Sequence, residues 1–282
     1  MPYLPPIPPP PSRRPPARTV GSVLAGLVVG SLTIFAISGF VPTGSNGWST
    51  GATRLADGST RPPAVATPSE VPLGIPAPPP PRSGQYSFLQ TQPGTNQPVA
   101  YDPCRPISIV INDRKAPPGG AHLVRDALDQ VSEITGFVFE IDGNTSEMPD
   151  LPRPPHQPDR YGDRWAPVLV VWADESDIPE LEGSAGLGGS SFVRAPGTDV
   201  DVYVSGVVIL HTSVIGDLMG STRGWLIAEG IVLHELGHLV GLGHVDDPNE
   251  LMYHDASYQY SFGPGDLTGL AALSAGRCVP RL

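Results

Sequence analysis

The pattern of apolar and polar positions divides the chain into an N-terminal part without core periodicity and a C-terminal part in which strand and helix patterns alternate. Short β-branched or apolar runs predict strands over residues 107–111, 137–141, 167–172, 183–194 and 200–210. Apolar residues that recur every three to four positions predict helices over residues 121–134, 225–240 and 266–275. This order of elements predicts an α+β domain over residues 99–282.

The N-terminal part consists of three segments of different composition. Residues 1–19 are rich in Pro and Arg, and residues 42–98 are rich in Pro, Ser, Thr and Gly. These compositions predict a cytoplasmic tail and an extended, disordered spacer. Between them, residues 20–41 form an uncharged apolar stretch that is long enough for a helix to cross a bilayer. Because arginines precede this stretch, the positive-inside rule places the tail inside and the domain outside the cytoplasm.

A cleaved signal peptide is the competing interpretation of residues 20–41. The small residues around Ile37 resemble a cleavage site, but the apolar run is longer than a usual signal core, so we favour an uncleaved single-pass anchor. A buried core helix is disfavoured because Pro-rich sequence flanks the run on both sides. Both favoured interpretations export the domain, which is either membrane-anchored or secreted.

Composition and charge narrow the classes of partner. The 282 residues include 36 Pro and 33 Gly, which indicates a folded domain attached to a low-complexity segment. The formal net charge of −11 argues against nucleic acid, because phosphate binding needs basic patches. In an exported protein, Cys104 and Cys278 are expected to form one disulfide that closes a long loop; the alternative is two buried free thiols.

Residues 234–244 read HELGHLVGLGH and contain the candidate metal ligands and the candidate general base. His234 and His238 are four residues apart on a predicted helix, so both imidazoles share one face and can bind one metal ion. Glu235 can reach a metal-bound water without being a ligand itself, and it is the expected general base. Gly241 allows the helix to end and the chain to turn back, so that His244 supplies a third nitrogen.

Three neutral imidazoles and a water form an open tetrahedral site, which is the pattern of catalytic zinc rather than structural zinc. The five residues at these offsets arise by chance in roughly one in a hundred thousand chains of this length, using average residue frequencies. The alternative, a set of ordinary histidines on a helix, is therefore disfavoured. One catalytic zinc ion is the expected cofactor.

These residues match the signature H-E-x-x-H-x-x-G-x-x-H of the metzincin metallopeptidases in full. Met252, within Leu-Met-Tyr, resembles the family's Met-turn beneath the metal, and the stretch 234–253 resembles the matrixins, as does the start of a last helix at 265–270. The resemblance implies a mixed, mostly antiparallel twisted sheet with an active-site helix and a C-terminal helix. It also implies that substrate binds as an added strand in a cleft between an edge strand and the Met-turn.

The chain departs from the matrixin pattern at several positions. Val245 follows the third histidine where animal matrixins usually carry Ser, and Ser83 occupies the Cys position of a sequence that is similar to their inhibitory segment. Residues 180–205 contain no histidine, so we expect no second zinc ion. A calcium site has little support in the sequence, although Asp199 and Asp201 could contribute ligands.

The sequence thus predicts a zinc-dependent endopeptidase, of bacterial envelope type, that hydrolyses peptide bonds of extracytoplasmic proteins through a zinc-bound water. Its partners would be a protein or peptide substrate and, through the N-terminal helix, the membrane. The alternative is a non-catalytic zinc-containing binding module of the cell envelope, against which Glu235 argues. A structural envelope protein, in which the anchor and spacer are the main feature, is the third hypothesis.

Overall fold

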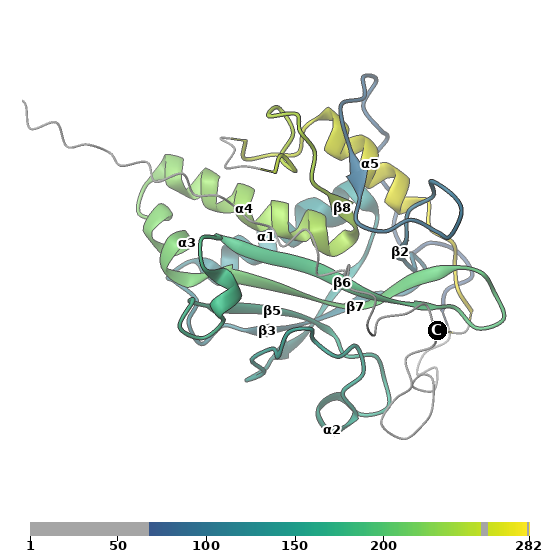
Figure 1. Cartoon of the computed structure of the whole chain (residues 1–282), viewed down its shortest axis with the longest axis horizontal. Coiled ribbons are helices and arrows are strands. Elements are labelled where there is room, and N and C mark those ends of the chain that lie inside the picture. The colour runs from purple at the N-terminus through teal and green to yellow at the C-terminus, as the bar shows by residue number, and fades with distance from the viewer. Residues whose placement is uncertain (1–67, 255–258, 281) are drawn as a thin grey trace, which may run out of the picture. The chain divides into compact units, whose positions relative to one another are not determined.

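Our computed structural model describes residues 68–254, 259–280 and 282, and within them one mixed sheet carries the domain (Figure 1). In this part of the chain the sheet has six strands. They are β2 (Ala100–Tyr101), β3 (Ile107–Asn112), β4 (Phe139–Asn144), β5 (Val168–Ala173), β6 (Gly186–Arg194) and β7 (Asp201–His211).

Most of the strand pairs are parallel. β7 pairs in parallel with β5 along its second half and with β2 along its first half, and β3 lies parallel to both β5 and β4. In the described chain, only β6 joins this sheet antiparallel, along the other edge of β7. The expectation of a mostly antiparallel sheet is therefore wrong. The physical reason lies in the connections, because a helix crosses over between β3 and β4 and a crossover returns the next strand in the same direction.

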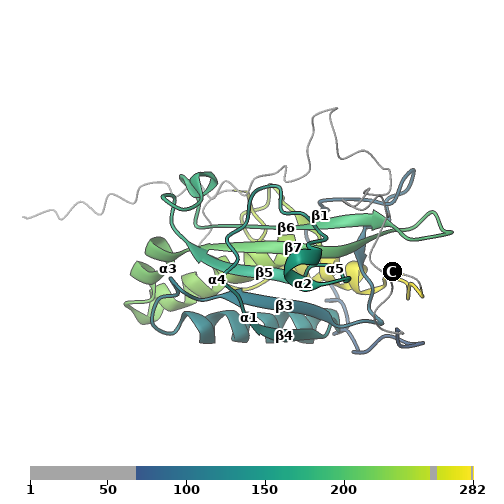
Figure 2. The same ribbon diagram turned by 90° about the horizontal axis from the view of Figure 1, so that it is seen from below.

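The larger helices lie on one face of the sheet (Figures 1 and 2). These are α1 (Gly120–Thr135) and α4 (Thr222–Val240), with α5 (Pro264–Ser274) beside the end of α4. The shorter elements are α2 (Pro158–Tyr161), the 3-10 turn η1 (Pro179–Leu181) and α3 (Thr212–Leu218). The predicted α+β class is confirmed, and so are the helices expected near 121–134, 225–240 and 266–275. The short helix α3 was not predicted.

The main core fills the space between the sheet and these helices. The amphipathic face of α1 contributes Leu123, Val124 and Val131, and the sheet contributes the inward side chains of β3, β5 and β7. β5 is buried at every position, as expected for a central parallel strand covered on both faces. A smaller apolar cluster lies on the opposite face, under the loops that include Ile178 and Leu181.

Residues 68–98 pack on the domain, although the sequence assigned them to the spacer. Backbone N–H groups of Ser69 and Leu73 donate to the carbonyls of Cys104 and Pro103, at 2.9 Å each. Further along, β1 (Ser87–Phe88) pairs antiparallel with β8 (Leu242–Gly243). The spacer expected over 42–98 is therefore shorter at its C-terminal end. Backbone groups make many of its contacts, and the side chains that add to them, such as Phe88 and Gln92, are too few to leave an apolar periodicity in the sequence.

No helix in the described part of the chain is both long enough and apolar enough to cross a bilayer. The expected anchor or signal at 20–41, the cytoplasmic tail at 1–19 and the first part of the spacer lie outside the described residues.

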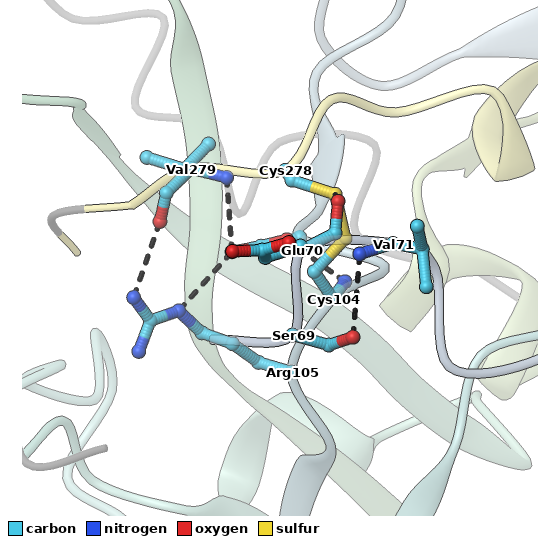
Figure 3. The surroundings of a disulfide bond; sticks show 8 residues. Ser69, Glu70, Val71, Cys104, Arg105, Cys278 and Val279 are labelled. Atoms are coloured by element: carbon cyan, nitrogen blue, oxygen red, sulfur yellow. Dashed lines mark hydrogen bonds and ion pairs between the residues drawn. A yellow bond between two sulfur atoms is a disulfide. The ribbon is translucent and has the colours of Figure 1, made fainter. Parts of the chain in front are cut away.

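Cys104 and Cys278 form a disulfide, which links the loop after β2 to the segment after α5 (Figure 3). Beside it, the buried carboxylate of Asp102 accepts hydrogen bonds from the backbone N–H groups of Cys104 and Val279, at 2.9 and 3.2 Å. Arg105 pairs with the same carboxylate at 3.1 Å and donates to the Val279 carbonyl at 3.1 Å. Covalent and polar contacts thus hold both ends of the domain together.

We predict that the double variant Cys104→Ser/Cys278→Ser is destabilised by about 2–5 kcal/mol, because the disulfide closes a loop with a sequence separation of 174 residues and restricts the unfolded chain. Denaturant unfolding of both proteins under oxidising conditions measures this difference. Under strong reducing conditions the two curves should converge. Equal stability under oxidising conditions would contradict the prediction.

Candidate metal centre

Helix α4 carries three of the predicted site residues in its last two turns. The helix starts at the N-cap Ser221, whose hydroxyl accepts the N–H of Gly224 at 3.0 Å, and it ends at Gly241 with φ of 122°. This backbone conformation favours glycine and turns the chain back toward the helix. His234, Glu235 and His238 are all buried.

The turn at Gly241 brings the third histidine to the other two. Nε2 of His244 lies 3.2 Å from Nε2 of His234 and 3.1 Å from Nε2 of His238. A tetrahedral zinc ion with Zn–N bonds of about 2.0–2.1 Å separates its ligand nitrogens by about 3.4 Å. The spacing of the three nitrogens therefore suits one zinc ion.

Backbone carbonyls orient the rings of the two helical histidines. Nδ1 of His234 donates to the carbonyl of Leu251, and Nδ1 of His238 donates to the carbonyl of Leu242, each at 2.8 Å. Because a carbonyl only accepts, each Nδ1 carries the proton and each Nε2 carries a lone pair. Ring orientation by an outer hydrogen bond is the usual support of a metal-ligating histidine.

The environment keeps all three imidazoles neutral. Burial lowers the pKa of His234 to about 4. Burial, with the neighbouring histidines, lowers the pKa of His238 well below its usual value. Burial, together with the charges of His234 and His254, lowers the pKa of His244 to about 4. Lone pairs that converge at neutral pH are a donor set for a cation, and their chemistry fits zinc.

Glu235 is the unusual member of the group. Its side chain is 0% exposed, and neither carboxylate oxygen has a hydrogen-bond partner within the described residues. Burial raises the pKa of this carboxyl to about 8 in the metal-free protein. A buried carboxyl without a partner is costly, which makes Glu235 a candidate functional group.

Met252 packs under the helix between the two histidines. It is buried, and a Cβ placed on Gly237 would lie only 2.6 Å from its sulfur. The backbone of Met252 accepts the N–H of Val245 at 3.0 Å, next to His244. Met252 therefore packs against the helix turn that carries His234 and His238, and its role as a Met-turn stays a prediction.

Two buried carboxylates hold this turn, and sequence reasoning did not identify them. Asp266, at the start of α5, accepts the N–H groups of Leu251 at 2.6 Å and Gly263 at 3.0 Å. Glu250 accepts the N–H groups of Gly265 and Asp266 at 2.9 and 3.1 Å, at the helix N-terminus where anions are favoured. Burial raises the pKa of Asp266 to about 6. Since the Leu251 carbonyl orients His234 and the Leu251 N–H is held by Asp266, α5 supports the candidate metal centre through a single residue, Leu251.

The N-terminal segment supports the loop of the third histidine. β1 pairs with Leu242 and Gly243, directly before His244, and the N–H of Leu89 donates to the carbonyl of Gly241 at 2.9 Å. Leu242 also supplies the carbonyl that orients His238. No motif in the sequence signals this contact, because it is made by backbone groups.

The other metal-binding possibilities are weaker. Asp201, considered with Asp199 for calcium, is paired with Arg194 at 2.6 Å. A group of Asp174, Glu175 and His211 lies elsewhere in the described chain, but its atoms already have partners. Asp174 accepts a hydrogen bond from the N–H of Ser213, and His211 accepts the N–H of Val214 and pairs with Glu175.

Comparisons with known proteins give structural likeness only. No protein-family model and no curated protein match the chain. Archaemetzincin from Methanopyrus kandleri is similar at 16% identity, with 58% of this chain and 92% of that chain covered and a TM-score of 0.34. A zinc-dependent peptidase from Methanocorpusculum labreanum (strain Z) is similar at 16% identity, with 58% of this chain and 98% of that chain covered and a TM-score of 0.31. Metalloproteinase-II from Bacteroides fragilis is similar at 13% identity, with 62% of this chain and 52% of that chain covered and a TM-score of 0.32. At TM-scores this low, the functional argument rests on the residues of the chain itself.

We predict that a chain that starts at residue 99 binds zinc about 10–100-fold more weakly than a chain that starts at residue 68, because it lacks the strand that fixes the loop before His244. Competition titration with a zinc chelator measures the affinity. In the longer chain, Leu89→Pro removes the hydrogen bond to Gly241 and should weaken binding in the same direction. Equal affinities for the two chains would refute the supporting role of β1.

Glu235 should make the stability of the metal-free protein depend on pH. Its folded pKa of about 8 exceeds the ordinary value of 4.5, so the folded state holds more protons than the unfolded state between these pH values. This contribution to stability falls as the pH rises through that window. Glu235→Gln removes it, while the histidine contributions remain in both proteins.

We therefore expect the variant to gain stability relative to the wild type, on the order of 3–5 kcal/mol from pH 4.5 to pH 8. Denaturant unfolding with chelator present at several pH values measures the gain. A difference that does not vary with pH would contradict the assignment.

Proposed function

We propose that this protein is a zinc-dependent endopeptidase, matrixin-like within the metzincins, that hydrolyses peptide bonds of extracytoplasmic proteins. The observation that carries the proposal is the convergence of three neutral imidazoles, two buried and one partly buried, beside a buried carboxyl that has no hydrogen-bond partner among the described residues. The signature that supplies these residues, with Met252 beneath them, supports the family assignment.

Each residue type has its own role in the proposed reaction. His234, His238 and His244 would hold the zinc ion, which when bound supplies Lewis acidity and lowers the pKa of a water molecule. Glu235 accepts the proton of the attacking water and delivers it to the leaving amine. Because the side chain of Glu235 is buried, its carboxyl is shielded from bulk water.

An extended peptide has a place to bind. In the described chain, β6 pairs only with β7, so its other edge can accept a substrate as an added strand. β6 also packs against α4 at Glu235, which brings that edge near the reacting groups. The apolar stretch at 20–41 and the disulfide support an extracytoplasmic, membrane-anchored location.

We predict that Glu235→Ala lowers peptide turnover by about 10²–10⁴-fold while zinc stays bound, because the residue moves protons and is not a ligand. The full chain is incubated with a mixed peptide library, and cleavage is read by mass spectrometry beside a chelator-treated sample. Glu229→Ala is the matched control, because this glutamate lies on an earlier turn of the same helix and bonds Gln130 of α1; the variant should cleave normally.

Cleavage that disappears in the Glu235 variant and with chelator, but not in the control, supports the endopeptidase. Two results would contradict the proposal: loss of zinc from Glu235→Ala, and no cleavage by the zinc-loaded wild type. The second result would favour a zinc-containing binding module.

A further inference from the structure

The face of β6 that packs against α4 has no side chains where the helix carries Glu235. Gly186 and Gly188 are two residues apart, so they lie on the same face of the strand. Both contact Glu235, and both have backbone conformations outside the left-handed region. An absent side chain, rather than unusual backbone torsion, is therefore what the helix requires at these positions.

The two glycines contact different parts of Glu235. A Cβ on Gly186 would lie 2.7 Å from Cγ of Glu235 and 3.0 Å from its Oε1, so this glycine faces the side chain. A Cβ on Gly188 would lie 2.2 Å from the backbone oxygen of Glu235. Gly188 therefore sets the distance between strand and helix, whereas Gly186 provides the space for the carboxyl.

Among the described residues, no polar contact holds the carboxyl of Glu235 in place. Both oxygens of Glu235 are buried and lack a hydrogen-bond partner within the described residues. A general base must be held within hydrogen-bond reach of the proton that it abstracts, and small displacements are costly. In this site the orientation must come from packing, and Gly186 forms part of the wall on which the side chain rests.

We propose that Gly186 is a positioning residue for Glu235, which orients the base by letting its side chain lie directly on the backbone of β6. The inference rests on the proposed peptidase function for its catalytic consequence. The packing relation between the two residues is independent of that function.

The first test is a double-mutant cycle in the metal-free full chain. Gly186→Ala should lower the Tm by about 3–10 °C, as overpacking does, and most of this loss should disappear when Glu235→Ala removes the opposing side chain. Gly188→Ala is the matched control. It meets backbone rather than side chain, so its effect should be the same with Glu or Ala at position 235.

The second test measures turnover of a peptide substrate by the zinc-loaded full chain. Gly186→Ala should lower kcat at least tenfold, within the range that a general base contributes, with little change in KM or zinc content. Gly206→Ala adds a methyl group at the same sheet–helix interface, where it meets Leu239, the Gly189 carbonyl and the Ser190 hydroxyl rather than Glu235, and it should keep most of its kcat.

The outcomes separate the two proposals. If Gly186→Ala is equally destabilising with Glu or Ala at position 235, or if it retains full kcat, the positioning role is refuted. If the wild type cleaves no peptide but the cycle shows coupling, the packing relation stands and the peptidase function fails.

Discussion

The close packing of α4 on the glycine face of β6 is the constraint on which the rest of the site depends. Contact of helix backbone with strand backbone at Gly188 fixes the depth of α4 on the sheet. This depth places Glu235 against the strand, where burial raises the pKa of its carboxyl. His234 and His238 are buried on the same helix, and burial keeps their imidazoles neutral. Small residues of one strand therefore set the position and the burial of Glu235 beside the candidate ligands.

Segments from distant parts of the chain orient the histidines of α4 and hold the loop of His244. The turn before Met252 supplies the carbonyl that orients His234, and Asp266 of α5 holds that turn. β1 pairs with the strand before His244, whose Leu242 carbonyl orients His238. The disulfide and Asp102 tie the segment after α5 to the loop after β2. The centre is thus supported through backbone groups from both ends of the domain.

The sequence predicted the grouping of the three histidines, but it did not predict most of the contacts that support them. The spacing of the histidines encodes a helix face and a turn, so three ring nitrogens could be placed together from local rules alone. Asp266, Gly186 and the strand β1 act through tertiary contacts that leave no periodic signal, and Pro-rich composition hid the start of the folded part. Strand direction was missed for a related reason: apolar runs show that a strand is buried, not which way it runs.

X-ray absorption at the zinc edge on the purified, zinc-loaded full chain tests the central claim most directly. The account predicts one zinc ion per chain, with three imidazole nitrogens at about 2.0–2.1 Å and one oxygen ligand. Replacing His244 by Ala should remove one imidazole from that shell. A shell that contains sulfur, or one that is unchanged in the His244 variant, would contradict the assignment of His234, His238 and His244 as the zinc ligands.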